Sequence, residues 1–154
     1  MTDVISEALE EYHNQVQKKS RLRLELLEQH GVTALWPSLM KAVESSSDRW
    51  GIADISRRIR AKELYCLAIW KDDLICGSLV LQPTVIEGMS GINILGLNSD
   101  GFSIDDWKEA ISILCDMLRT ANVKTLMAVS DNPRVIEIMK ADDWRLRTVG
   151  SREV

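Results

Sequence analysis

The stretch GINILGLNSDGFSIDDWKEAISILCDMLRTANVKTLMAV, residues 91–129, decides the fold of this 154-residue chain. It begins and ends with short apolar runs, over 91–97 and 123–129, that have the length and composition of buried strands. A helical pattern separates the two runs. Because a strand, an amphipathic helix and a strand in succession normally form a right-handed crossover, we expect the two strands to lie parallel in one sheet.

The helix between these strands carries a start signal and a continuous apolar stripe. Ser103 and Asp106 have the spacing of a capping box, in which each side chain bonds the backbone N–H of the other residue. From Ile104 to Leu118, apolar residues recur at intervals of three and four positions, which places them on one face of a helix. We expect this face to pack on the sheet.

Apolar runs outside this unit predict further strands. Residues 64–70 and 74–82 are separated by a short polar break, a spacing typical of an antiparallel hairpin. Residues 83–90 are expected to form a loop, and the alternating residues 144–149 to form a final strand. The remaining predicted helices begin near Thr33, at Ile52 and after Pro133. The predicted fold class is therefore α/β (α+β), with a mixed central sheet flanked by helices.

Residues 3–30 are predicted to form one charged helix, so the chain divides into an N-terminal helical extension over 1–31 and a domain over 32–154. The helix has a narrow apolar stripe, which is stable only when it is covered, either by the domain or by a partner. Both alternatives are open at this point. Trp50 is a further candidate for a contact with a partner. The candidate partner-binding residues are Ile5, Leu9, Tyr12, Val16 and Trp50.

Composition narrows the classes of function. Hydrophobic residues make up 45% of the chain and charged residues 27%, which excludes bulk disorder. The formal net charge of −4 argues against a protein whose main task is to coat nucleic acid. No apolar run approaches the roughly 20 residues of a membrane span. The first nine residues have neither the basic start nor the apolar core of a secretory signal.

The cysteines and histidines predict no redox or metal site. Cys66, Cys76 and Cys115 lie in separate apolar stretches without a C-x-x-C pair, so we expect small buried side chains in a reducing compartment. His13 and His30 are the only histidines, which is too few for the usual metal-ligand clusters.

The order of elements, together with several short motifs, resembles the acyl-CoA N-acyltransferase (GNAT) fold over residues 32–150. The motifs more specifically resemble a phage-encoded subgroup with this fold, which includes small internal virion proteins of T7-like phages. The motifs that carry the resemblance are Trp36-Pro37, the strand start Glu63-Leu64-Tyr65-Cys66-Leu67, Gly77, the strand end Ile94-Leu95-Gly96-Leu97, and Asp106-Trp107.

The resemblance implies a cofactor site at the turn before the long helix, because active members hold the pyrophosphate of the coenzyme there with backbone N–H groups. The corresponding turn here lacks the family's Gln/Arg-x-x-Gly-x-Gly/Ala spacing, and the carboxylates of Asp100, Asp105 and Asp106 are expected to repel a pyrophosphate. The candidate cofactor-binding residues of this degenerate turn are Asn98, Ser99, Gly101 and Ser103.

The resemblance also implies a general base on or near the third strand of the domain, where this chain offers Asn93, with Glu87 in the preceding loop as the other candidate. Family members often carry a tyrosine acid on the helix after the second parallel strand, and residues 132–143 contain no tyrosine. We therefore assign no catalytic residue and no metal ligand at this point.

We expect a non-catalytic phage virion or assembly component that uses no cofactor and acts through contacts with other virion or host proteins, in the host cytoplasm or in the virion. Association into homo-oligomers is also open. One alternative is an N-acetyltransferase that depends on acetyl-CoA. A second alternative is a small phage regulator that binds a host protein.

Overall fold

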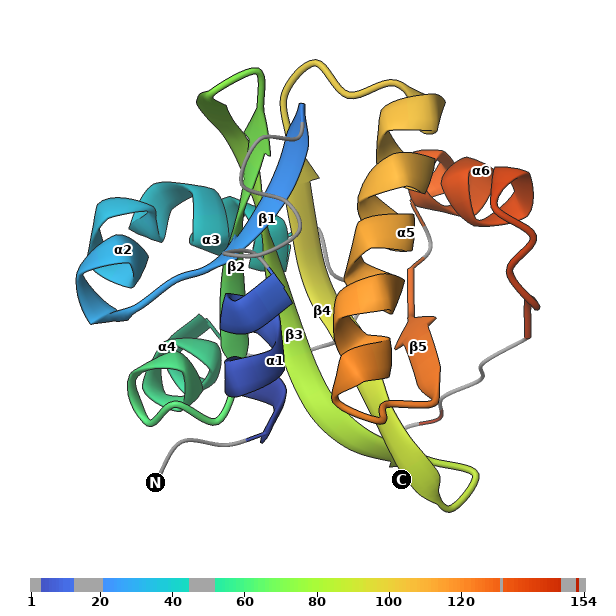
Figure 1. Cartoon of the computed structure of the whole chain (residues 1–154), viewed down its shortest axis with the longest axis horizontal. Helices are drawn as coiled ribbons and strands as arrows, with labels where there is room; N and C mark the ends of the chain where they lie inside the picture. The colour runs from blue at the N-terminus through green and yellow to red at the C-terminus, as the bar shows by residue number, and fades with distance from the viewer. Residues whose placement is uncertain (1–3, 13–20, 45–51, 131, 148–151, 153–154) are drawn as a thin grey trace.

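The computed structural model describes residues 4–12, 21–44, 52–130, 132–147 and 152. A five-stranded sheet in the order β1-β2-β3-β4-β5 forms its centre (Figure 1). The strands are β1 (Leu22–Leu26), β2 (Tyr65–Lys71), β3 (Leu74–Ile86), β4 (Met89–Ser99) and β5 (Thr125–Ala128). The helices are α1 (Val4–Tyr12), α2 (Gln29–Ala34), α3 (Trp36–Glu44), α4 (Ile52–Arg60), α5 (Ile104–Thr120) and α6 (Pro133–Ala141).

The sheet has the mixed character that the sequence predicts. The first four strands are antiparallel, and β4 and β5 are parallel and are joined by α5. The predicted loop over 83–90 is wrong, because β3 and β4 continue to the pair Ile86↔Met89. Only Glu87 and Gly88 remain between them, both with positive φ, as a two-residue hairpin turn requires.

The predicted helix over residues 3–30 is wrong after Tyr12. Residues 22–26 form β1, which pairs antiparallel with β2. The reason is visible in the sequence, because Leu22, Leu24 and Leu26 alternate with charged residues at the period of a strand. Leu22 and Leu24 are both fully buried. Residues two positions apart share one face of a strand but lie on different faces of a helix.

Two further elements differ from the predictions. The helix expected to begin near Thr33 is two short helices, α2 and α3. The final strand expected over 144–149 is not formed by residues 144–147, and positions 148–149 lie outside the described residues. Instead, the Trp144 N–H donates to the Met139 carbonyl at the end of α6, and Arg145 and Arg147 contact Glu87.

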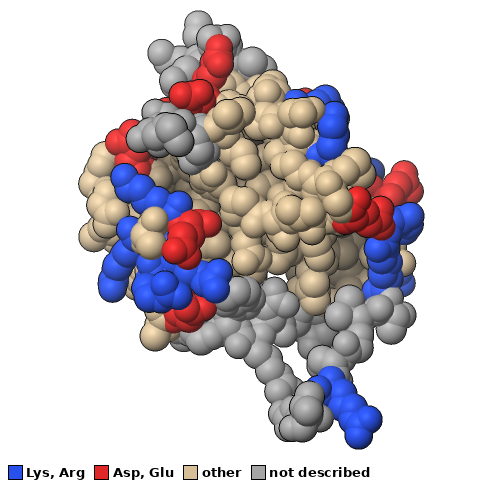
Figure 2. Space-filling view, turned by 90° about the horizontal axis from the view of Figure 1, so that it is seen from below, with Lys and Arg blue, Asp and Glu red and all other residues tan. Residues whose placement is uncertain are grey.

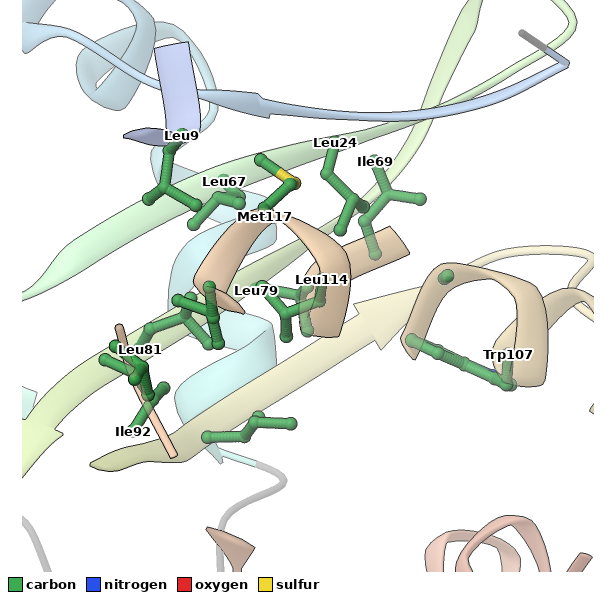
Figure 3. Close-up of a cluster of buried hydrophobic side chains, with 14 of the residues drawn as sticks. Leu9, Leu24, Leu67, Ile69, Leu79, Leu81, Ile92, Trp107, Leu114 and Met117 are labelled. Atoms are coloured by element: carbon green, nitrogen blue, oxygen red, sulfur yellow. The ribbon is translucent and has the colours of Figure 1, made fainter. Parts of the chain in front are cut away.

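Helices cover both faces of the sheet. The larger apolar cluster lies under α1 and α5, where Figure 3 shows Leu114 and Met117 of α5 facing Leu79 and Leu67 of the sheet. Leu9 of α1 belongs to the same cluster and is fully buried. The smaller cluster joins α2, α3 and α4 to the opposite face. Residues on both sides of the predicted boundary at residue 31 contribute to these clusters, and the division into two parts stays a prediction.

Gly96 lets α3 approach the sheet closely. A Cβ atom at this position would clash with the Ala42 carbonyl oxygen of α3. Any larger residue would therefore push α3 away from β4. This contact fixes the position of α3 relative to the middle of β4.

One buried carboxylate joins three elements at the start of α5. The Asp106 Oδ1 atom accepts from Arg21 Nη2 at 2.9 Å, and Oδ2 accepts from Lys71 Nζ at 2.9 Å and from the Ser103 N–H at 3.1 Å. The Ser103 hydroxyl accepts from the Asp106 N–H, which completes the predicted capping box. The hydrogen bond from Lys71, supported by those from Arg21 and Ser103 and opposed by desolvation, holds the pKa of Asp106 well below its usual range.

We expect Asp106→Asn to lower the free energy of unfolding at pH 7 by about 1.5–3 kcal/mol, as for a hydrogen bond to a charged group. Because the folded-state pKa lies below the unfolded value, Asp106 stabilises the fold at neutral pH, and this stabilisation is lost as the pH falls below about 4. Urea titrations at several pH values should therefore show the two proteins converging in acid. The exposed Asp105→Asn is the matched control, and an equal loss in both variants would contradict the role of Asp106.

Burial of Leu9 makes α1 a structural part of the core. We expect Leu9→Ala to cost about 2–5 kcal/mol of unfolding free energy, as for other fully buried leucines. The control Val4→Ala, on the same helix but 66% exposed, should change it by less than about 0.5 kcal/mol. Thermal and urea unfolding measure both variants. If Leu9→Ala behaves like Val4→Ala, α1 does not pack as described.

Candidate functional site

The candidate site lies where β4 and β5 part. Their parallel pairing begins at Gly91↔Thr125 and ends at Ile94↔Ala128, while β4 continues to Ser99 beside β3. Residues 95–99 of β4 therefore have no partner in β5 and lead directly toward the start of α5. Such a divergence places the end of β4 beside a helix N-terminus.

A β-bulge at Leu95 marks the start of this divergence. On β3, Leu81 pairs with Ile94 and Val80 pairs with Gly96, so Leu95 has no opposite residue. Ile94 packs in the cluster under α5, whereas Leu95 packs in the cluster under α3 and α4. Bulges bend a strand and often stand next to functional sites, because they redirect the residues that follow.

The turn after β4 presents unused backbone donors. In the described part of the chain, the N–H groups of Gly101, Phe102, Ile104 and Asp105 make no hydrogen bond, whereas the Asp100 N–H donates to the Cys76 carbonyl. The positive end of the helix macrodipole lies at the same place. The turn can therefore receive an anion.

The predicted cofactor residues divide into two groups. Gly101, with φ of +72°, lies in the turn, and Ser103 caps α5. Asn98 and Ser99 belong instead to β4, opposite Ser78 and Gly77. The Asn98 amide reaches Ser38 Oγ at 3.5 Å, so the structure holds this side chain against α3.

Three cations that the sequence analysis did not associate with the turn lie close to it. Lys71 Nζ donates to the Gly101 carbonyl at 3.2 Å, and Arg134 Nη2 donates to the Phe102 carbonyl at 3.4 Å. Lys71 also binds Asp106 together with Arg21. The expected repulsion between Asp106 and a pyrophosphate is thus reduced, because two cations already compensate this carboxylate.

Few side chains near the divergence could transfer a proton. Asn93 is only 8% exposed; its Nδ2 atom donates to Gln82 Oε1 at 3.3 Å, and its Oδ1 atom has no hydrogen-bond partner. Glu87 lies at the exposed tip of the β3–β4 hairpin, paired with two arginines. Tyr12 lies on α1 and Tyr65 at the start of β2. Asn93 is therefore the polar group that the fold buries next to the divergence.

The described residues of the predicted partner-binding stripe pack against the core of the same chain. Leu9 is fully buried, and Ile5 and Tyr12 pack against the same core. Burial, together with the nearby Asp116 carboxylate, raises the pKa of Tyr12. Val16 and Trp50 lie outside the described residues. Their role as partner contacts stays a prediction.

Other classes of site find no support among the described residues. No group of three or more His, Cys, Asp or Glu side chains there could hold a metal ion. No helix in the same part of the chain is long and apolar enough to cross a membrane. Burial raises the pKa of the Cys66 thiol to about 12, so this cysteine is a poor nucleophile.

The chain is similar to solved acetyltransferase structures at low sequence identity. No protein-family model and no curated protein sequence matches it. An aminoglycoside acetyltransferase from an uncultured soil metagenomic sample superposes with a TM-score of 0.63 at 10% identity, over 90% of this chain and 99% of that one. A ribosomal-protein-alanine N-acetyltransferase from Brucella melitensis biovar Abortus 2308 gives 0.64 at 12% identity, over 86% and 97% of the two chains.

A third similar structure is that of AAC(6′)-Iy in complex with the bisubstrate analog CoA-S-monomethyl-acetylneamine. Its TM-score is 0.58 at 12% identity, over 88% of this chain and 99% of that one. None of these similarities points to a phage-encoded subgroup, so that part of the sequence resemblance is without support. At such identities the likeness concerns the fold. The chain therefore has the GNAT acetyltransferase fold, with a five-stranded mixed sheet flanked by helices and an N-terminal helix.

Proposed function

We propose that this chain is an N-acetyltransferase that binds acetyl-CoA where β4 and β5 diverge. The observation that carries the proposal is the end of β4–β5 pairing at Ile94↔Ala128, after which residues 95–99 of β4 lead to a turn with unused N–H donors. An extended chain with amide groups, such as the pantetheine arm of the coenzyme, can enter where two neighbouring strands separate. This proposal replaces the non-catalytic role as our preferred function.

The turn supports the phosphate end of the proposed site. Backbone N–H groups at Gly101, Phe102 and Ile104 are available to phosphate oxygens, and the α5 macrodipole favours negative charge there. Arg134, at the start of α6, already reaches the turn through the Phe102 carbonyl. Its guanidinium would add a charge-assisted contact to a pyrophosphate. Arg134 thus takes the part of the basic residue that the turn itself lacks.

The chemistry of the proposed site depends on Asn93. Acetyl-CoA, when bound, supplies the thioester whose acyl carbon an amine attacks. The unpartnered Oδ1 atom of Asn93 can accept a hydrogen bond from that amine and orient it, but an amide cannot remove its proton. The proton therefore goes to solvent, and the leaving thiolate takes one back from solvent. We expect slow transfer that becomes faster at higher pH, where more of the amine is unprotonated.

A second function remains a candidate because one observation favours it. Asn93 stands where an active enzyme would carry a base, and α6 has no tyrosine to serve as an acid. A protein that keeps the fold without the reaction would act through contacts with other proteins, as a virion component or as a regulator of a host factor. Binding of acetyl-CoA without transfer to any amine would favour this second function.

We expect calorimetry to show micromolar binding of acetyl-CoA and a roughly fivefold weaker affinity for Arg134→Ala, which corresponds to about 1 kcal/mol. Arg119→Ala is the matched control, because Arg119 is an exposed arginine paired with an acidic residue of its own helix, like Arg134. It should leave the affinity unchanged. Absence of acetyl-CoA binding by the unaltered protein would refute the proposed function.

We expect Asn93→Leu to leave the free energy of unfolding unchanged or raise it by up to about 1 kcal/mol, because it removes an unsatisfied buried oxygen. The same variant should lower acetyl transfer to primary amines, measured as release of the coenzyme thiol. Asn93→Asp has the same shape and should instead destabilise the fold at pH 7, because it buries a charge. A loss of more than about 2 kcal/mol in Asn93→Leu would mean that Oδ1 is satisfied in solution.

A further inference from the structure

Two amide side chains lie next to each other on the face of the sheet opposite α5. Asn93 of β4 and Gln82 of β3 are directly paired. Their chain neighbours Ile92, Ile94 and Leu81 belong to the cluster under α5, and successive side chains of a strand point to opposite faces. Both amides therefore face the side of α3 and α4. Asn93 Nδ2 donates to Gln82 Oε1 at 3.3 Å, which orients the two amides relative to each other.

Each amide has one hydrogen-bonding group left over. Asn93 Oδ1 has no partner, and Gln82 Nε2 makes no hydrogen bond within the described part of the chain. Asn93 is 8% exposed, whereas Gln82 is half-buried, so the free donor lies nearer to solvent than the free acceptor. A ligand that satisfies both groups must carry a donor at its inner end and an acceptor close behind it.

The strand positions around this amide pair carry no charge. The next residues on the same face are Thr84 of β3 and Gly91 of β4, and Met127 of β5 lies beside Asn93. None of these described residues is titratable. Glu44, at the end of α3 on the same side of the sheet, is exposed and makes no hydrogen bond or ion pair in the described part of the chain.

The surface at the lower end of the sheet is also poor in charge. Figure 2 shows charged side chains gathered toward the margins of this view, over α4 at the left, with mainly uncharged side chains in the middle. The visible middle surface therefore offers little attraction to a strongly cationic acceptor.

These surroundings favour a weakly basic amine. An ammonium ion beside buried amides would lose hydration without a carboxylate to compensate its charge, so the amine must arrive unprotonated. The α-amino group of a peptide has a pKa of about 7.7–8.0, against about 10.4 for a lysine side chain. At about pH 7.5, roughly a third of the α-amino groups are unprotonated, but only roughly 0.1% of the lysine side chains.

The start of a peptide chain also matches the hydrogen-bonding groups of the amide pair. Its amine enters first and donates to Asn93 Oδ1, and the carbonyl of its first residue accepts from Gln82 Nε2. A lysine side chain has methylene groups in place of that carbonyl. It therefore leaves the Gln82 donor without a partner.

We infer that the acceptor is the α-amino group at the start of a peptide chain, which Asn93 receives and Gln82 recognises through the first carbonyl. This inference rests on the proposed acetyltransferase activity and names its substrate class. The unprotonated nitrogen attacks the acyl carbon of the thioester, a C–N bond forms and the C–S bond breaks. The nitrogen loses one proton to solvent, and the leaving thiolate takes one from solvent.

Two acceptors test the inference on the unaltered protein. One is alanine tripeptide amide, with a free α-amino group, and the other is Nα-acetyl-lysine amide. With acetyl-CoA at about pH 7.5, we expect kcat/KM for release of the coenzyme thiol to be higher for the tripeptide by about tenfold or more. The rate with the tripeptide should level off above about pH 8, whereas the rate with the lysine compound should continue to rise. Equal use of the two acceptors, or transfer to neither, overturns the inference.

Gln82→Glu tests the recognition of the carbonyl. This variant keeps an oxygen that accepts from Asn93 Nδ2, but it removes the donor and adds a carboxylate. It should raise KM for the tripeptide and lower the preference for the tripeptide over the lysine compound by about fivefold or more. Gln29→Glu, on an exposed glutamine of α2, is the matched control and should leave the preference unchanged. Circular dichroism confirms that each variant is folded.

Glu44→Gln examines the carboxylate at the end of α3 and should also leave transfer unchanged. A loss of transfer in Glu44→Gln, or an unchanged preference in Gln82→Glu, overturns the inference. The calorimetry described above separates this failure from that of the proposed function. If the unaltered protein binds acetyl-CoA and transfers to lysine equally well, only the substrate class is wrong, whereas absence of acetyl-CoA binding refutes the activity itself.

Discussion

The carboxylate of Asp106 is the constraint on which the arrangement of this fold depends. It accepts hydrogen bonds from Arg21 before β1, from Lys71 at the end of β2 and from the N–H of Ser103, the N-cap residue of α5. A buried carboxylate without these partners would be costly, so the three segments must meet at one point. Once α5 is held there, its apolar face lies over the sheet, and Leu114 and Met117 reach the core (Figure 3).

The same cluster determines what the start of α5 can receive. Lys71 and Arg21 compensate the charge of Asp106, so this carboxylate repels an anion less. The turn before the helix also has unused N–H groups, and Arg134 of α6 contacts it. The β4–β5 divergence leads into this turn. The binding half of the proposed acetyltransferase site thus has more suitable groups than its chemical half, where Asn93 offers a hydrogen-bond acceptor and no proton acceptor.

The predictions from sequence were confirmed where a periodic pattern ran over many residues, and they were wrong where the pattern covered only a few residues. The helix over 104–118, its capping box and the parallel strands around it are confirmed. β1 was missed because Leu24 and Leu27, three positions apart, also fit the stripe of a charged helix. The loop over 83–90 was wrong because a two-residue turn at Glu87 and Gly88 has little sequence signal outside glycine.

The sequence by itself determined the α+β class, the α5 crossover and the capping box at the start of α5, because helical periodicity and capping depend on residues a few positions apart. Only the tertiary structure decided which charges meet. The Arg21–Asp106 pair spans 85 positions and the Lys71–Asp106 pair spans 35, so neither leaves a local pattern. The unpartnered oxygen of Asn93 arises in the same way, since it depends on how separate elements pack.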